Sequence, residues 1–201
     1  MGTTRNVAIY VFDQVEVLDF AGPFEVFSTA SRVYSRLHPK AGKPFDVFTI
    51  AAQMGVVTAR GDLLVEPKFR ISNHPAIDVL VVPGGVIEEE LEREAVIRWI
   101  QSIAQSSVVT ASVCTGAFLL AKAGLLSGKS AITHWEDVDT FETMFPDIQV
   151  DRTARWVDEG RVVTSAGISA GIDMSLHLVS RLEGIELARL TARQMEYRWI
   201  E

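Results

Sequence analysis

The sequence predicts an α/β fold with a mostly parallel central sheet and helices on both faces. Short, continuously apolar segments alternate with helical segments along most of the 201 residues. Such apolar segments are typical of strands buried on both faces of a parallel sheet. Strands that alternate with helices are typical of layered α/β proteins. The length favours a single domain over residues 1–201, and the sequence contains no linker, repeat or low-complexity stretch.

The first half of the chain predicts one long helix, one amphipathic helix and the strands between them. An apolar strand over 7–12 precedes a helix that opens at Gly22-Pro23 and ends at His38-Pro39. The following segments are a strand over 45–52, a hairpin with strands 56–59 and 63–66 around Gly61-Asp62, a buried strand over 78–83 and an amphipathic helix over 88–104.

The second half continues the alternation. A strand over 108–113 leads into a small apolar helix over 116–123. The remaining segments are a short strand over 130–133, a helix over 135–145 stopped by Pro146, a hairpin with strands 155–158 and 161–165 around Glu159-Gly160, and helices over 169–182 and 185–199.

Composition and charge exclude several classes of function. Apolar residues make up 48% and charged residues 22%, which is typical of a globular protein. The 19 basic and 26 acidic residues give a net charge of −7, and no basic run is present. Binding to nucleic acid or to an anionic membrane surface is therefore disfavoured. No apolar stretch reaches the ~18 residues of a membrane span.

The single cysteine, Cys114, excludes an intramolecular disulfide and a cysteine-based zinc cluster. The amino-terminal residues lead directly into the first strand, without the apolar region of a secretory signal. We therefore expect a cytoplasmic, reducing location.

Chemically useful residues follow three of the predicted buried strands. Asp19 follows the first strand, Gly84-Gly85 follow the strand over 78–83, and Cys114 and Thr115 follow the strand over 108–113. Ligands of open α/β sheets bind outside the carboxyl ends of the strands. The sequence therefore predicts that a carboxylate, a glycine pair and a thiol share one site.

Cys114 lies between a strand and a helix, as the nucleophile does in a nucleophile elbow. The amino terminus of the following helix is expected to lower the pKa of the thiol, because unpaired N–H groups favour an anion. The alternative is a buried cysteine that acts as a small apolar side chain.

Two further groups are candidates for the same site. The amides of Gly84, Gly85 and Thr115 could stabilise a developing anion, although two glycines also suit a plain tight turn. Asp19 could exchange protons with Cys114 or could cap the helix that follows it, and its residue type alone favours the cap.

The remaining polar candidates carry weaker signals. His134 is the one histidine at a predicted strand end, where a hydrogen-bonding role is favoured over catalysis. Asp173 opens a predicted helix and suits its dipole better than a catalytic role. The sequence has no metal-ligand spacing and no glycine-rich nucleotide motif, so we expect neither a metal nor a cofactor.

Taken together, the motifs resemble those of the ThiJ/PfpI superfamily from Val7 to about Tyr197. They are LDFAGP (18–23), VPGG (82–85), SVCTG (112–116), AGLLSGK (123–129), THW (133–135) and AGISAGID (166–173). The resemblance implies a flavodoxin-like three-layer sandwich of the class I glutamine amidotransferase-like type.

Within the superfamily, the chain is most similar to the isonitrile hydratase branch. Asp19, Cys114 and Thr115 match the catalytic residues of that branch, which adds water to an isocyanide without a metal or organic cofactor and releases an N-substituted formamide. The resemblance also implies a small-molecule substrate and a homodimer. Exposed-looking aromatic residues give the dimer partial support: Trp99, Trp156 and Trp199.

Other branches provide the alternatives. The sensor domains of AraC-type regulators share much of the pattern, and here we expect no helix-turn-helix domain because the sequence ends at Glu201. A small-molecule or redox sensor that uses Cys114 is therefore the second hypothesis. A glyoxalase or deglycase reaction is the third, although that branch has Glu at the position of Asp19. The protease branch has His where this chain has Thr115, which argues against peptidase activity.

Overall fold

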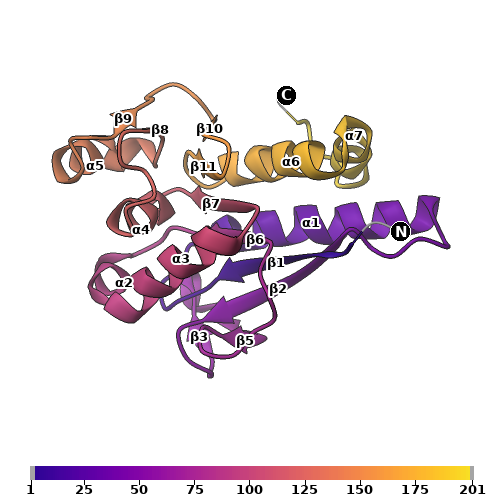
Figure 1. Ribbon diagram of the computed structural model, residues 1–201, viewed down its shortest axis with the longest axis horizontal. Coiled ribbons are helices and arrows are strands. Elements are labelled where there is room, and N and C mark those ends of the chain that lie inside the picture. Colours follow the sequence, from indigo (N-terminus) through magenta and orange to yellow (C-terminus); the bar gives the residue numbers. More distant parts are fainter. Residues whose placement is uncertain (1–2, 200–201) are drawn as a thin grey trace.

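The computed structural model describes residues 3–199, which form a mixed sheet flanked by helices (Figure 1). The strands of the main sheet are β1 (Arg5–Tyr10), β2 (Phe45–Ala51), β5 (Phe69–Arg70), β6 (Val79–Val82), β7 (Val109–Val113), β10 (Trp156–Asp158) and β11 (Val162–Ser165). They lie in the order β10-β11-β7-β6-β1-β2-β5, and β10 is the one antiparallel member. The expected mostly parallel α/β fold is confirmed.

Helices cover both faces of this sheet. They are α1 (Val17–Leu37), α2 (Glu88–Glu92), α3 (Glu94–Ser106), α4 (Gly116–Lys122), α5 (Val138–Met144), α6 (Ala170–Glu183) and α7 (Ile185–Gln194). Helices α1, α6 and α7 pack together on one face, and α2, α3 and α4 group on the other (Figure 1). The three layers agree with the sandwich that the resemblance implies.

Two smaller strand pairs complete the fold. Strands β3 (Val57–Thr58) and β4 (Leu64–Val65) form an antiparallel hairpin around the 3₁₀ helix η1 (Arg60–Asp62). Strands β8 (Ser130–Ala131) and β9 (Gln149–Val150) pair in parallel beside α5 and the 3₁₀ helix η2 (Trp135–Asp137). Both hairpins expected from the sequence, β3–β4 and β10–β11, are present.

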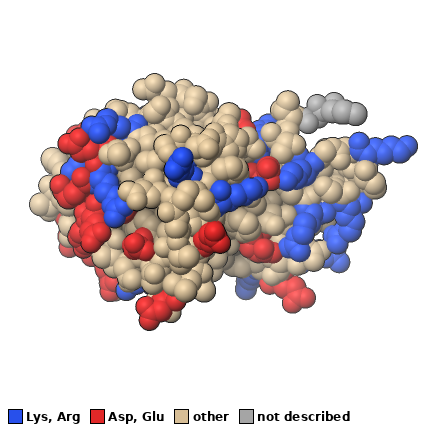
Figure 2. Space-filling view, turned by 90° about the horizontal axis from the view of Figure 1, so that it is seen from below, with Lys and Arg blue, Asp and Glu red and all other residues tan. Residues whose placement is uncertain are grey.

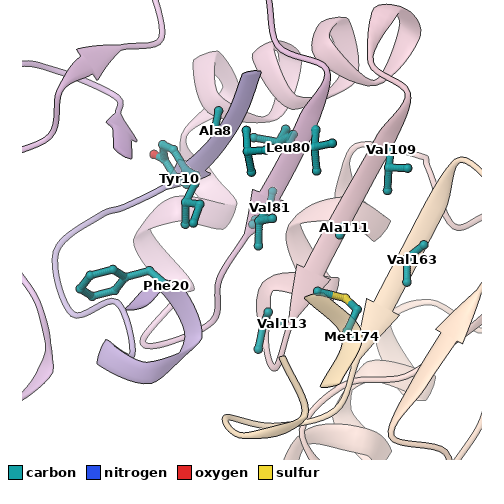
Figure 3. Packing of buried hydrophobic residues seen from close by; sticks show 14 of the residues in the cluster. Ala8, Tyr10, Phe20, Leu80, Val81, Val109, Ala111, Val113, Val163 and Met174 are labelled. Carbon is teal, nitrogen blue, oxygen red and sulfur yellow. The ribbon is translucent and has the colours of Figure 1, made fainter. Parts of the chain in front are cut away.

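The hydrophobic core lies on the central strands. Val81 and Ala111 are fully buried on the neighbouring strands β6 and β7, and Met174 from α6 packs over the sheet (Figure 3). Because both faces are covered, these strands need no polar side, which explains their continuous apolar sequence. Each fully buried aliphatic side chain contributes roughly 1.5–3 kcal/mol to folding.

The chain order of the strands reverses at β1. From β1 the chain runs to β2 and β5 at one edge, and then returns to β6 on the other side of β1. Ligands of open α/β sheets bind at such a switch point, outside the carboxyl ends of the two strands. The segments after β1 and β6 are therefore the first place to look for a site.

Several predicted boundaries were wrong. Helix α1 begins at Val17, five positions before the expected opening at Gly22, and carries Pro23 inside it. Burial of Asp19 and Phe20 holds this additional turn, so packing overrides the proline signal. The last helix ends at Gln194 and does not reach 199.

The expected helix over 88–104 is also interrupted. Arg93 has the non-helical angles φ −80° and ψ 80°, and it separates α2 from α3. Its guanidinium Nε lies 3.1 Å from Glu90 Oε1, so an ion pair with a buried carboxylate accompanies the break. The two-residue strands β5 and β9 were not expected, because two residues are too few for a periodic pattern.

The aromatic support for a dimer contact was wrong for Trp99. Its side chain belongs to the core, with 8% exposure, and its Nε1 donates a hydrogen bond to His74 Nε2 over 3.0 Å. Trp156 and Trp199 are partly buried against the same core. Within residues 3–199, no helix has both the length and the apolar character that crossing a membrane requires.

Candidate active site

Cys114 occupies a strained turn between β7 and α4. Its φ of +57° is in the left-handed region, which non-glycine residues rarely adopt. The backbone N–H of Cys114 donates to Ser165 O on β11 over 3.1 Å, and the side chain is 7% exposed. This is the strand–turn–helix position of a nucleophile elbow, and strain of this kind is concentrated at functional sites.

Gly116 allows this turn to pack closely against the end of β6. A Cβ atom at this position would lie 2.1 Å from Val82 O, which no side chain could accommodate. The absence of a side chain therefore keeps the Cys114 turn beside the segment that follows β6.

Asp19, in the first turn of α1, contacts the loop that follows β6. The side chain is fully buried, and its Oδ2 accepts a hydrogen bond from the Gly84 N–H over 3.0 Å. The expected helix-capping role is therefore wrong: Glu16 is the N-cap residue, and the carboxylate binds the loop after β6 instead. Asp19 and Gly84 lie at the switch point of the sheet.

The second oxygen of Asp19 is only loosely held. Oδ1 is buried and lacks a well-formed hydrogen bond within the described residues. The Cys114 thiol is nevertheless near enough to lower the pKa of the carboxyl group by hydrogen bonding. A buried, under-used carboxylate oxygen beside a thiol is available for proton exchange.

Burial controls the ionisation of both groups. Desolvation raises the pKa of Asp19 to about 7, and the Gly84 N–H opposes that shift. Desolvation and the charge of Asp19 raise the pKa of the Cys114 thiol to about 12, against the N–H groups of Thr115 and Ile168. The expectation of a lowered thiol pKa was wrong, since burial and the carboxylate outweigh the amides.

The amides of the glycine pair have protein partners. The Gly84 N–H binds Asp19, and the Gly85 N–H donates to Thr115 Oγ1 over 3.0 Å. The Thr115 hydroxyl in turn donates to Gly85 O over 3.0 Å. The expected oxyanion pocket is therefore corrected: the amides of Thr115 and Ile168 face the sulfur, whereas those of Gly84 and Gly85 position Asp19 and Thr115.

Two residues that support Cys114 were missed at the sequence level. Ile168 has a φ of +49°, and its N–H faces the thiol. The Thr133 hydroxyl donates to Cys114 O over 3.0 Å. Both lie in segments that had already been singled out for their sequence, 133–135 and 166–173, but sequence spacing alone assigns neither contact.

A cavity of about 300 Å³ opens over the thiol. His134 lines it, and its Nδ1 lies 3.5 Å from Asp137 Oδ2 and accepts a long hydrogen bond of 3.4 Å from the Glu136 N–H. The residues around the cavity are Glu16, Arg60, Gly85, Cys114, Thr115, His134, Glu136, Asp137 and Ile168. The four charged members were not expected, because the loops that carry them meet only in the folded chain.

Asp173 lies outside this lining. Its Oδ2 accepts hydrogen bonds from Arg155 Nε over 2.7 Å and from the Tyr197 hydroxyl over 3.1 Å. The carboxylate therefore joins α6 to the segment before β10 and to the residues after α7. This ion pair is a structural role that the sequence did not indicate.

A second cavity, of about 320 Å³, lies at the ends of β1 and β2. Its buried Tyr10 hydroxyl donates to Glu90 Oε2 over 2.5 Å, and Glu90 also pairs with Arg93. These polar groups are satisfied, and no thiol is present, so we place the candidate site at Cys114. Among residues 3–199, no group of three or more His, Cys, Asp or Glu side chains is arranged to hold a metal ion.

Comparison with known proteins finds one family model and several proteins that are similar to this chain. The model of the DJ-1/PfpI family matches residues 5–181. The isonitrile hydratase of Pseudomonas putida is 34% identical over 193 residues, which cover 96% of this chain and 78% of that protein. The transcriptional regulator GbdR of Pseudomonas aeruginosa is 29% identical over 96% of this chain, which spans 51% of the regulator's length.

Solved structures share the fold. A ThiJ/PfpI family protein from Pseudomonas syringae has a TM-score of 0.85 at 23% identity, over 100% of this chain and 78% of that one. Drosophila melanogaster DJ-1beta has a TM-score of 0.81 at 19% identity, over 98% of this chain and 100% of that one.

Proposed function

The chain belongs to the DJ-1/PfpI family, and on this premise we propose that it is a cysteine-dependent hydratase that converts an isocyanide into an N-substituted formamide. The observation that carries the proposal is the pairing of Cys114, on its strained turn, with the buried carboxylate of Asp19. The 34% identity to an isonitrile hydratase over 96% of the chain supports it.

The first step joins the sulfur to the isocyanide carbon. Ionised Asp19 accepts the thiol proton of Cys114 as the sulfur attacks, and then delivers that proton to the same carbon. One S–C bond and one C–H bond form, and the product is a thioimidate on Cys114. Because the pKa of the free thiol is high, the resting protein holds little thiolate, and the thiol instead passes its proton to the neighbouring carboxylate during the attack.

The second step adds water. Asp19 removes a proton from a water molecule as the water oxygen attacks the thioimidate carbon, and this proton passes to the substrate nitrogen. The C–S bond then breaks, the sulfur takes the proton of the new hydroxyl group, and the N-substituted formamide leaves. The sum is the isocyanide plus one water, and neither oxidant nor reductant is consumed.

Backbone and side-chain donors position these steps. The amides of Thr115 and Ile168 stabilise negative charge on the sulfur during attack and departure. The Thr115 hydroxyl is bound to Gly85 on the cavity wall, so it orients that wall. His134 lines the same cavity, where it can bind the substrate nitrogen.

The test is turnover of a simple alkyl isocyanide by the purified protein, with the formamide measured by chromatography and mass. Wild-type turnover that is lost in both Cys114→Ala and Asp19→Asn supports the proposal. Full turnover by Cys114→Ala, or no formamide from the wild type, contradicts it. Loss of methylglyoxal in the same preparation would favour the glyoxalase or deglycase reaction.

A small-molecule sensor is the second candidate. The observation in its favour is the match to helix-turn-helix transcriptional regulators, which the chain covers over about half of their length. The cavity over Cys114 would then bind an effector without turnover. Saturable binding in the absence of any product would support this function.

The proposed setting is the cytoplasm, where the free thiol that the reaction needs is kept reduced. We also propose that the protein is a homodimer. Light scattering should then give about twice the 22.2 kDa of one chain, whereas a mass of one chain would contradict the dimer.

A further inference from the structure

The charged residues around the thiol are mostly acidic. Glu16, Glu136 and Asp137 supply three carboxylates to the cavity lining, and Arg60 is the one lysine or arginine in that lining. Arg60 Nη1 lies 3.4 Å from Glu16 Oε2, so its charge is partly balanced by that carboxylate. Glu136 and Asp137 on η2 have no lysine or arginine beside them in the lining, and their ionisable neighbour there is His134, whose Nδ1 lies 3.8 Å from Glu136 Oε2 and 3.5 Å from Asp137 Oδ2.

These charges act on the reacting groups. The charge of Asp137 contributes to the high pKa of the Cys114 thiol. Glu16 raises the pKa of Asp19, and Arg60 lowers it. The electrostatic field of the lining therefore reaches the place where the substrate carbon must lie.

One face of the molecule is polarised in the same sense. Figure 2 shows that, on this face, acidic side chains gather at the end where α2 lies, with some basic side chains among them, and that basic side chains dominate the opposite end. The acidic end is the one to which the strand arrow of β1 points in Figure 1, and the candidate site lies outside the carboxyl ends of β1, β6 and β7. A cleft lined by one sign of charge concentrates ligands of the opposite sign.

We propose that this site selects substrates that carry a positively charged group, such as an ammonium group on the isocyanide substituent, and rejects anionic ones. The proposal rests on the proposed function, because it names the substrate class of the same site. The cation would lie towards Glu136 and Asp137 at the outer part of the cavity, where these side chains are 63% and 39% exposed. The reactive carbon would lie over Cys114.

The electrostatic part can be tested without any turnover. Methanethiosulfonate reagents that carry trimethylammonium, sulfonate or no charge transfer their RS group to a thiolate, forming a disulfide and releasing methanesulfinate. Since Cys114 is the one cysteine, the intact protein mass reports this site alone. Each rate constant is divided by the rate constant of 2-mercaptoethanol with the same reagent, which corrects for the reactivity of the reagent. For each variant, the rates with the charged reagents are then divided by its rate with the neutral reagent, which corrects for the reactivity of the thiol.

We expect the normalised rate of the cationic reagent to exceed that of the anionic reagent by about tenfold or more at low ionic strength, and the ratio to fall as salt screens the exposed carboxylates. Glu136→Gln with Asp137→Asn should lower the ratio severalfold, and Arg60→Gln should raise it. The control double variant, Asp46→Asn with Glu94→Gln, removes the same net charge outside the cavity lining and should leave the ratio near the wild-type value.

A ratio near one, or a faster anionic reagent, would overturn the proposal. So would equal kcat/KM values for matched ammonium, neutral and carboxylate isocyanides in an enzyme that hydrates all three. Failure of the proposed function is distinguishable, because a strong preference for the cationic reagent without hydration of any isocyanide removes the hydratase and leaves the charge selection of the site.

Discussion

At the scale of single residues, Asp19 and Cys114 behave as a coupled pair. The carboxylate raises the pKa of the thiol, so removing its charge should lower that pKa. Asp19→Asn is therefore expected to abolish hydration and, at pH 8, to make alkylation of Cys114 by iodoacetamide severalfold faster.

Intact-mass kinetics of alkylation provide the measurement. Asp46→Asn removes a carboxylate of an exposed ion pair and should change neither rate. Slower alkylation of Asp19→Asn would contradict the assignment of the Asp19 charge as a cause of the high pKa of the thiol.

The pH dependence of turnover follows from the same pair. The mechanism requires ionised Asp19, whose pKa burial raises to about 7. Values of kcat/KM should therefore rise between about pH 5 and pH 8, with an apparent midpoint near 7 that belongs to the pair as a whole. A profile that falls over this range would mean that the protonated carboxyl group is the active form.

The sequence places the main residues of the site but not their ionisation. Strand-end positions were enough to predict that Cys114, Asp19 and Gly84 lie together, because parallel strands direct their carboxyl ends to one edge. The pKa of the thiol depends on how deeply the turn is buried and on its distance from Asp19. Neither quantity is encoded in local spacing.

At the scale of elements, the turn between β7 and α4 depends on close contact with β6. A methyl group at Gly116 would meet Val82 O, so Gly116→Ala should lower the free energy of unfolding by roughly 2 kcal/mol or more and should disturb the thiol. Gly128 is the matched control. It has a φ of +68° and open space around it, so Gly128→Ala should cost only the ~1–2 kcal/mol of left-handed backbone.

Urea unfolding of both variants, together with alkylation of Cys114, checks this comparison. Equal losses of stability, with an unchanged alkylation rate in Gly116→Ala, would show that the turn tolerates the methyl group.

Elements were predictable where one physical signal dominates. The strands β1, β6 and β7 are continuous apolar runs and were predicted within one or two residues at most boundaries. The start of α1 was not predictable, because burial of its first turn overrides Pro23. The break at Arg93 was missed as well, since the ion pair that accompanies it is tertiary.

At the scale of the whole molecule, the site is expected to cost stability. Burial raises the pKa of Asp19 from 3.8 to about 7, so the folded state binds this proton more tightly than the unfolded chain. The stabilisation from the protonated group is complete below about pH 4 and is lost as the pH rises through 7.

Asp19→Asn removes this penalty. Its free energy of unfolding should exceed that of the wild type by on the order of a few kcal/mol at pH 8, and the gain should shrink towards pH 5. Urea unfolding at both pH values measures the difference. A gain that is the same at both would place its origin outside the ionisation of Asp19.

The acidic end of the molecule is also a whole-molecule property. The net charge of −7 was evident from the sequence, but the gathering of carboxylates near the cavity depends on loops far apart in the chain. Arg60 on η1 and Asp137 on η2 line the same cavity. The sequence therefore predicted a small-molecule site, and the folded structure supplies its proposed charge preference.

The central claim is that the Cys114 sulfur bonds to the isocyanide carbon before water is added. The most direct measurement is rapid acid quenching of the protein with excess alkyl isocyanide, followed by intact-mass and peptide analysis. We predict a transient gain of one isocyanide mass on the peptide that contains Cys114, which decays as the formamide appears and is absent in Cys114→Ala. Formamide production by the wild type without this adduct, or equal production by Cys114→Ala, would contradict the account.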